Sequence, residues 1–371
     1  MVKLTGEFRG SWSKEGSALQ AREELPMMNG VVSQAALVGW SDLLPRYGVD
    51  VGGLSQGLGL DLTCEARPGD HLALRDFVRF LETAAFQLRR PDFFWRAGEI
   101  YDYRLLGLVG ETLLSAKTLG GALRIFAKYF GLLQDSTELT MTVDERFATL
   151  RYRILDPNIW PRGRDAEFTM GIMARMIRET VGADWRHADI IFEVDRPTGG
   201  HGLSDYLKIN CGYGGSANVI RIPVAWLSLP FAQQAKIGPG PRTGINESPL
   251  SRSLVERNRR ASIQDRTRYH LFKTIGIGEV DQTVVAQEMG MSRRTLRRRL
   301  GREGLNFQSI VDDCRMEVAT LELVRRPRAS LAEIALVLGY TEHSSFTRAF
   351  NRWNGMSPQA YRKAELTASG A

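Results

Sequence analysis

The sequence predicts two domains of different fold class, an α+β domain followed by an all-α domain. The chain has 371 residues, which is enough for two domains at roughly 100–200 residues each. Through most of the first 235 residues the apolar positions recur at helical spacing, and a few short runs alternate, which indicates helices with a small antiparallel sheet. The last third shows helical periods, and two of its segments share one helix-turn-helix pattern.

The first domain is expected over 29–235, after a loose polar leader at 1–28. Two alternating runs separated by Asp144-Glu145-Arg146 predict a β-hairpin, because successive side chains of a strand point to opposite faces. The predicted helices are 31–47, 74–88, 105–114, 119–133 and 168–180, and the predicted strands are 140–143, 147–154, 190–194 and 219–222. These strands are too few for a jelly-roll barrel.

A segment rich in proline and glycine, 236–250, is the predicted linker. It holds three prolines and three glycines, residues that interrupt regular structure. The charge changes at the same place: residues 250–371 carry 21 basic and 13 acidic side chains, a net of +8, whereas residues 1–249 have a net of −1. We therefore expect the second domain, 251–371, to meet an anionic partner, either nucleic acid or a membrane surface.

The first helix-turn-helix unit is expected at about 283–300. A short helix ends at Gly290, because glycine most readily adopts the left-handed conformation that terminates a helix. Ser292 can cap the next helix by accepting hydrogen bonds from free backbone N–H groups. That helix places Leu296 and Leu300 four residues apart on its buried face.

The second unit, expected at about 331–351, repeats this pattern with a turn one residue longer. Ser330 and Glu333 form a capping box before the first helix of the unit. Gly339 lies 49 residues after Gly290 and is followed by two buried-face phenylalanines, Phe346 and Phe350. A single pattern of this kind can arise in any short pair of helices, but two copies favour a DNA-binding domain over a plain helical bundle.

One long helix, 307–325, is predicted between the two units. Its 19 residues would span roughly 28 Å at about 1.5 Å per residue. Successive major-groove faces of DNA lie about 34 Å apart, so this helix can hold two recognition helices over adjacent turns.

Side chains suited to DNA lie on the second helix of each unit. Arginine can pair bidentately with guanine and can also bind phosphates, so some of these arginines are expected to fix position without reading sequence. The first unit offers mainly charge, and the second a mixture of short polar groups with one arginine. The expected DNA-contacting residues are Arg293, Arg294, Arg297, Arg298, His343, Ser344, Ser345, Thr347 and Arg348.

From about 280 to 363 the chain resembles the DNA-binding domain of the AraC/XylS family. The residues that carry the resemblance are Ile334-Ala335, Gly339-Tyr340, Phe346-Thr347-Arg348-Ala349-Phe350 and Gly355-Met356-Ser357-Pro358-Gln359-Ala360-Tyr361-Arg362. The family usually has a bulkier or aromatic residue where this chain has Leu300. The resemblance implies a sequence-specific transcription regulator, which we expect to be an activator, acting on double-stranded promoter DNA. It places the base-facing residues of the first unit at Arg294, Arg297 and Arg298.

The first domain resembles the sensor domain of regulators of ornithine, amine and carnitine catabolism, through 108–111 and 115–123. These sensor domains are helix-rich with a small sheet. The resemblance implies a small-molecule effector, such as an amine, an amino acid or a related compound, and a homodimer that acts with RNA polymerase. An acid and aromatic rings would suit a cation, so the candidate effector-binding residues are Trp95, Tyr101, Tyr103 and Glu167.

An enzyme and an architectural DNA binder are the two other classes of protein that the sequence could represent. An alkyltransferase fused to such a domain needs a reactive cysteine and a zinc-bound cysteine cluster, but Cys64, Cys211 and Cys314 are far apart in the sequence. We therefore expect no enzyme, no metal and no cofactor. An architectural DNA binder that needs no ligand is the alternative, although it would have no use for a nearly neutral first domain. Without a signal peptide or an apolar stretch long enough for a membrane, a cytoplasmic location is expected.

Overall fold

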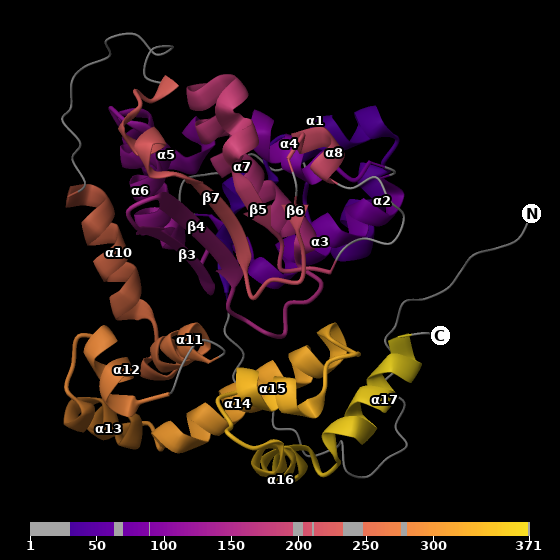
Figure 1. Cartoon of the computed structure of the whole chain (residues 1–371), viewed down its shortest axis with the longest axis vertical. Coiled ribbons are helices and arrows are strands. Elements are labelled where there is room, and N and C mark those ends of the chain that lie inside the picture. Colours follow the sequence, from indigo (N-terminus) through magenta and orange to yellow (C-terminus); the bar gives the residue numbers. More distant parts are fainter. Residues whose placement is uncertain are drawn as a thin grey trace, which may run out of the picture.

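The computed structural model describes seven stretches of the chain. They are 30–62, 70–88, 90–195, 203–209, 211–232, 248–275 and 280–369. The predicted leader, 1–28, lies outside them, as does the predicted linker, 236–250, apart from its last three residues. We call 30–232 the first domain and 248–369 the second domain; the bounds expected from the sequence, 29–235 and 251–371, stay predictions. Figure 1 shows the first domain above the second.

The beginning of the first domain corrects one prediction, because 31–47 is not a single helix. It folds as strand β1 (Val31–Ser33), 3-10 helix η1 (Gln34–Leu37), helix α1 (Trp40–Leu43) and 3-10 helix η2 (Leu44–Tyr47). Gly39 has a φ of +88°, a left-handed conformation that interrupts a right-handed helix and that glycine adopts without steric cost. The apolar residues have helical spacing, but the helix is interrupted at this glycine.

A five-stranded sheet forms one side of the first domain, in the order β3-β4-β7-β5-β6. Its strands are β3 (Thr137–Val143), β4 (Phe147–Ile154), β5 (Asp189–Ile191), β6 (Cys211–Gly212) and β7 (Asn218–Pro223). The predicted hairpin is confirmed, with Thr140 opposite Arg151. The pairing of β5 with β6 is parallel and the other pairings are antiparallel. A separate two-stranded sheet joins β1 to β2 (His71–Ala73).

Helices pack against this sheet and against each other. They are α2 (Val51–Leu58), α3 (Leu74–Gln87), α4 (Phe93–Ile100), α5 (Gly107–Leu114), α6 (Leu119–Tyr129), α7 (Gly163–Val181) and α8 (Leu203–Leu207), with 3-10 helices η3 (Tyr103–Leu106), η4 (Phe130–Leu132), η5 (Gly182–His187) and η6 (Val224–Ser228). Helices α4 and α7 meet at Gly98 and Gly171, where a Cβ atom would lie only 2.1 to 2.2 Å from a carbonyl oxygen of the other helix. Only glycine permits this close approach.

The regular elements in the described part of the second domain are all helices. Its helices are α10 (Ser248–Arg260), α11 (Ile263–Thr274), α12 (Gln282–Glu288), α13 (Arg293–Arg302), α14 (Phe307–Arg325), α15 (Leu331–Val337), α16 (His343–Asn354) and α17 (Pro358–Ser369). The long helix α14 has the predicted bounds. Together with the first domain, this confirms the predicted fold class.

Both helix-turn-helix units bury their apolar faces in one shared core. Leu296 and Leu300 of the first unit, and Phe346 and Phe350 of the second, are each 0–1% exposed and belong to one buried cluster. Leu155 of the first domain belongs to the same cluster. The two domains therefore share an apolar contact at Leu155.

Candidate DNA-binding face and first-domain cavity

The first helix-turn-helix unit is built by a glycine turn and a serine cap. Gly290 has a φ of +71° and ends α12. The Ser292 hydroxyl oxygen then accepts a hydrogen bond from the Thr295 backbone N–H, at 3.2 Å, which caps α13. With Leu296 and Leu300 buried beneath it, α13 has a fixed orientation and presents its remaining faces to solvent.

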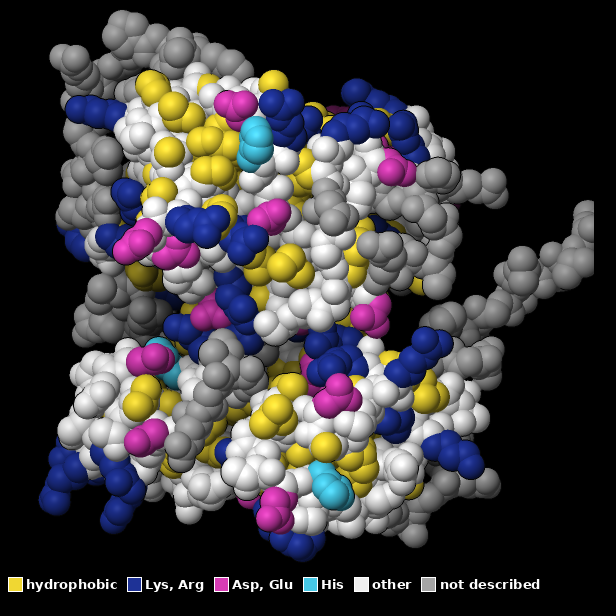
Figure 2. Space-filling view, viewed as in Figure 1, with side chains coloured by type: hydrophobic (Ala, Val, Ile, Leu, Met, Phe, Trp, Pro, Cys, Tyr) yellow, Lys and Arg dark blue, Asp and Glu magenta, His cyan; other side chains and the backbone are white. Residues whose placement is uncertain are grey.

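The exposed faces of α13 carry a dense group of guanidinium groups. Figure 2 shows basic side chains projecting from the edge of the second domain where α13 lies. Arg293 donates from Nε to Gln282 Oε1 at 3.1 Å, which ties it to α12. The exposed arginines of α13 include the four predicted from the sequence, Arg293, Arg294, Arg297 and Arg298, and also Arg299. This group suits phosphate and guanine, which are acceptors for arginine.

The second unit has the predicted capping box at its start. The Ser330 hydroxyl accepts from the Glu333 backbone N–H at 3.2 Å, and the Glu333 carboxylate accepts from the Ser330 N–H at 2.7 Å. Gly339, with a φ of +80°, ends this first helix of the unit. The residues that begin and end this helix therefore lie within it or directly beside it in the sequence, which is why they could be predicted.

The second recognition helix, α16, offers fewer free groups than its sequence implies. Thr347 donates its hydroxyl to the His343 carbonyl oxygen at 2.9 Å, and Arg348 donates to the Ser345 hydroxyl at 3.1 Å. Ser344 donates to the Glu342 carboxylate at 3.1 Å. His343 and Arg348 are exposed, whereas the two serines and the threonine are half-buried. The exposed pair is therefore the most accessible to a base edge.

Helices α13 and α16 lie toward opposite ends of α14, on the side of the second domain away from the first domain (Figure 1). The 19 residues of α14 correspond to roughly 28 Å, close to the spacing of about 34 Å between successive major-groove faces. This arrangement places the two sets of exposed side chains on a common face.

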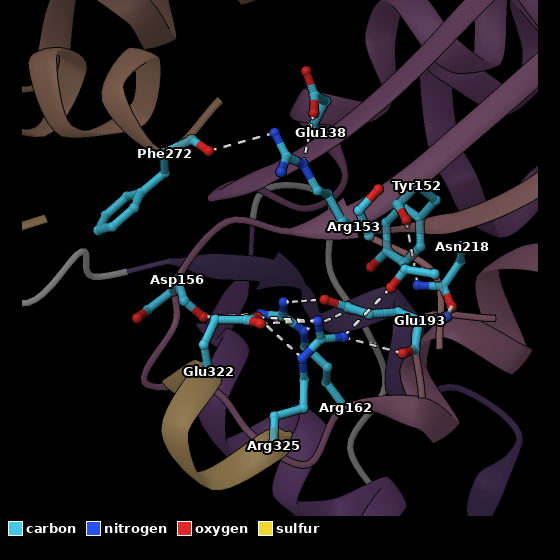
Figure 3. A network of polar contacts seen from close by, with 12 residues as sticks. Glu138, Tyr152, Arg153, Asp156, Arg162, Glu193, Asn218, Phe272, Glu322 and Arg325 are labelled. Atoms are coloured by element: carbon cyan, nitrogen blue, oxygen red, sulfur yellow. Dashed lines mark hydrogen bonds and ion pairs between the residues drawn. The ribbon is translucent and has the colours of Figure 1, made fainter. Parts of the chain in front are cut away.

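The opposite side of the second domain contacts the first domain through Arg153 of β4 (Figure 3). Its Nη2 donates to the carbonyl oxygens of Lys273, at 2.9 Å, and Phe272, at 3.4 Å. Both carbonyls belong to the last turn of α11, where helical carbonyls have no partner within the helix. Nε of the same guanidinium donates to Glu138 Oε2 at 2.8 Å. The first domain thus supplies a C-terminal cap to a helix of the second domain.

A second contact joins the end of α14 to the segment that follows β5 of the first domain. Arg325 donates from Nη1 to the carbonyl oxygen of Glu193 at 3.1 Å and pairs with Glu322 at 3.0 Å. The Glu193 side chain is held in turn by Arg162, with 2.7 Å between Nη2 and Oε1. Figure 3 shows these side chains converging where the two domains meet.

A third contact connects the middle of α14 to both domains. Arg268 of α11, only 1% exposed, donates from Nη2 to both carboxylate oxygens of Glu317 at 2.8 Å. Asn158 of the first domain donates to the same carboxylate at 3.1 Å. This buried acid could not be predicted from the sequence, because the helical period of α14 indicates a buried face made of apolar residues alone.

A small, mostly apolar cavity in the first domain is a candidate effector site. Its volume is about 40 Å³. Of the four residues selected from the sequence, Tyr101 lines it, whereas Trp95, Tyr103 and Glu167 do not. The residues around the cavity are Val32, Ser33, Ala35, Ala36, Phe77, Tyr101, Leu105, Leu106, Phe126, Phe130, Leu133, Gln134, Phe168, Thr169 and Ile172.

The three residues outside the cavity have contacts elsewhere; the Arg175 guanidinium, for example, lies 4.9 Å from the centroid of the Tyr103 ring. Trp95, 0% exposed, donates its indole N–H to Glu99 at 2.9 Å. Glu167 pairs with Arg164 at 2.6 Å, and burial raises the pKa of its carboxyl to about 7 against the opposing charge of Arg164. The acid and two of the three aromatic residues that the sequence suggested for a cation therefore do not line this cavity. Helical spacing could not show which face of α7 meets the cavity.

A buried polar chain begins at the edge of the cavity. Gln134 donates from Nε2 to the Tyr152 hydroxyl at 2.7 Å, and Tyr152 donates to Asp165 Oδ2. The second oxygen of Asp165 is buried without a hydrogen-bond partner. Burial raises the pKa of this carboxyl to about 7, and the hydrogen bond from Tyr152 opposes the rise.

Potential metal ligands lie apart from one another in the described part of the chain. No group of three or more histidine, cysteine, aspartate or glutamate side chains there could hold a metal ion. Cys211 and Cys314 are buried as free thiols, while Cys64 lies outside the described residues. Within the same residues, no helix is both long and apolar enough to span a bilayer.

Two family models match the chain in consecutive regions. One is described as the arabinose-binding domain of AraC transcription regulator, N-terminal, and matches 48–231. The other is described as a helix-turn-helix domain and matches 285–364. The boundary between them falls in the same region as the predicted linker.

Similar proteins match over most of their length. The HTH-type transcriptional regulator VirS of Mycobacterium tuberculosis is 26% identical over 342 residues, which cover 90% of this chain and 97% of that protein. The ornithine utilization regulator of Pseudomonas aeruginosa is 27% identical over 331 residues, 87% of this chain and 94% of that one. Among solved structures, the transcriptional regulator CdpR from Pseudomonas aeruginosa is 19% identical, with a TM-score of 0.37, and the match covers 84% of this chain and 96% of that chain.

Proposed function

Because this chain belongs to the AraC family of transcription regulators, we propose that it is a sequence-specific activator controlled by a small effector. Its matched domains and relatives are regulators and not enzymes. The observation that carries the proposal is the placement of α13 and α16 on one side of the second domain, with the first domain on the other (Figure 1). One side can bind promoter DNA while the other receives a signal.

The two recognition helices would make different contributions to binding. Arg294, Arg297 and Arg298 share one exposed face of α13, and each can pair with guanine or bind phosphate. On α16, His343 and Arg348 would read base edges directly. Phosphate contacts fix the position of the protein on DNA, and base contacts specify the sequence.

Control by an effector would act through the contact between the domains. A ligand shifts an equilibrium only if it binds one arrangement more tightly than the other. Arg153 and Arg325 join the two domains in the arrangement described here, so an effector that favours or disfavours these contacts changes the freedom of the second domain. Couplings of about 1–3 kcal/mol are typical, which corresponds to about 5–150-fold in DNA affinity.

We further propose that the protein works in the cytoplasm as a homodimer that contacts RNA polymerase. One second domain carries two recognition helices and would cover one half-site, and a tethered pair raises the effective concentration at a repeated site. The alternative, an architectural DNA binder without a ligand, gives no role to a cavity or to capping of α11 by another domain.

The proposal is tested by titrating DNA containing the protein's preferred site with wild-type protein and Arg298→Ala. If Arg298 reads a guanine, the variant should lose about 1–3 kcal/mol of binding free energy and relax preference at one base pair. Arg186→Ala is the matched control, because it removes the same charge from an exposed position in η5 of the first domain. Equal losses on every sequence would make Arg298 a phosphate contact, and no binding by the folded wild-type protein would refute the proposal.

A further inference from the structure

The cavity in the first domain has walls that are almost entirely apolar. Aromatic rings from three helices contribute to it: Phe77 from α3, Phe126 from α6 and Phe168 from α7. None of the fifteen residues around the cavity is a lysine, arginine, histidine, aspartate or glutamate. An ionised ligand placed there would be removed from water without a counter-charge in contact, which is strongly unfavourable.

Polar groups in the wall are few and uncharged. Ser33, Thr169 and Tyr101 offer hydroxyls and Gln134 an amide. Tyr101 already donates to the Ala35 carbonyl oxygen, and Gln134 to Tyr152. A sugar carries several hydroxyls, each of which would need a partner once buried. The wall cannot supply so many, but it can satisfy a single polar end group.

The cavity is so small that its walls must move when a ligand binds. Its volume of about 40 Å³ is well below the roughly 150 Å³ of an engineered cavity that admits benzene. A ligand with a ring must therefore move the walls apart. One hydrogen bond that joins two sides of the cavity runs from the Tyr101 hydroxyl to the Ala35 carbonyl oxygen, at 2.9 Å, so separation of these walls would strain or break it.

We propose that this cavity binds an uncharged compound with an aromatic or branched aliphatic body and one hydrogen-bonding end group. The inference rests on the proposed control by an effector and names its chemical class. It differs from the amine or amino acid expected from the sequence, because the wall of the cavity supplies no acid to pair with a cation.

The position of the polar wall connects this ligand to the second domain. Gln134 bonds to Tyr152 of β4, and the next residue of that strand, Arg153, caps α11. A ligand that displaces Gln134 therefore acts one residue away from the contact between the domains. Expansion of the cavity would therefore change the contact between the two domains, through which the proposed effector acts.

The test uses four probes that share one ring: benzyl alcohol and benzamide, which are uncharged, benzylamine, a cation, and benzoate, an anion. Calorimetry and thermal unfolding of the full chain at neutral pH report binding at millimolar concentration. The two uncharged probes should bind saturably and raise the melting temperature. The charged probes should bind at least about tenfold more weakly, because the cavity offers no charge to pair with theirs.

Matched variants locate the bound probe. Thr169→Val removes a hydroxyl from the wall and should weaken binding of benzyl alcohol about two- to tenfold, the usual effect of one hydrogen bond. Thr112→Val makes the same change at a buried threonine of α5 that does not line the cavity, and should leave binding unchanged. If both variants weaken binding equally, the probe is bound elsewhere and the assignment of the cavity is wrong.

Other outcomes separate this inference from the proposed function. Stronger binding of benzylamine or benzoate than of the uncharged probes would overturn the ligand class while leaving effector control intact. Failure of all four probes to bind would overturn the assignment of the cavity. DNA binding measured on the same preparation is independent of these results, and its loss would count against the proposed function instead.

Discussion

Replacing Arg153 by methionine should loosen the contact between the two domains, because one guanidinium group holds three acceptors there. It donates to the carbonyl oxygens of Lys273 at 2.9 Å and Phe272 at 3.4 Å, and to the Glu138 carboxylate at 2.8 Å. Methionine keeps an unbranched apolar side chain but removes all three hydrogen bonds. The last turn of α11 then loses its cap from the first domain.

The expected loss of stability follows from the hydrogen bonds and the ion pair that Arg153 makes. A hydrogen bond to a charged group contributes about 1.5–3 kcal/mol. The hydrogen bond from Arg153 to the Lys273 carbonyl oxygen, at 2.9 Å, has the usual length for such a bond. Glu138 stays buried in the variant, with the Lys273 ammonium nitrogen 3.9 Å away. Removing one partner of a buried ion pair costs about 3–5 kcal/mol. We expect a total loss in that range, of which about 1.5–3 kcal/mol concerns the contact between domains.

Urea unfolding should report the total loss, and hydrogen exchange should localise it to α11 and the adjoining part of α14. Arg151→Met is the matched control: it removes the same charge from the same strand, but Arg151 bonds to Ser216 of the first domain at 3.2 Å. If Arg153→Met behaves like this control, and exchange in α11 is unchanged, Arg153 does not join the domains in solution.

Three further predictions concern stability. Gly290→Ala should cost about 1–2 kcal/mol, because the φ of +71° is unfavourable for a residue with a side chain, and denaturant unfolding would detect it. Arg268→Met should cost about 3–5 kcal/mol by leaving Glu317 buried without its bidentate partner, and the double variant Arg268→Met/Glu317→Met should recover most of that loss in the same assay. Burial raises the pKa of Asp165 to about 7, so the folded protein retains a proton that the unfolded chain releases near pH 4. The contribution of Asp165 to stability should therefore fall as pH rises from about 4 to 7, so the stability of Asp165→Asn relative to the wild-type protein should rise over this range; a constant difference would show that the carboxyl is ionised in the folded protein.

The helix-turn-helix units could be predicted because their signals are local. Gly290 and Ser292 determine a turn and a cap from within a few residues, and the same holds for Ser330 and Glu333. The long helix between the units was predicted with its correct bounds, since its apolar residues repeat without interruption.

The cavity and the contact between the domains could not be predicted, because they depend on residues far apart in sequence. Tyr101 meets Ala35, and Arg153 meets Lys273, only after the chain has folded. Glu167 was selected as an acid on an apolar helix, but it pairs with Arg164 three residues earlier. This pair has the i, i+3 spacing of neighbours on a helix, so the sequence did carry a signal for it.

Selection of binding sites from a random pool of double-stranded DNA tests the central claim most directly, namely that two recognition helices read one face of promoter DNA. The wild-type protein should enrich sites in which two specified blocks lie about 10 base pairs apart, centre to centre. Arg298→Ala should relax one block and Arg348→Ala the other, because these residues lie on α13 and α16. Enrichment of a single block that both variants alter, or no enrichment by folded protein, would contradict the account.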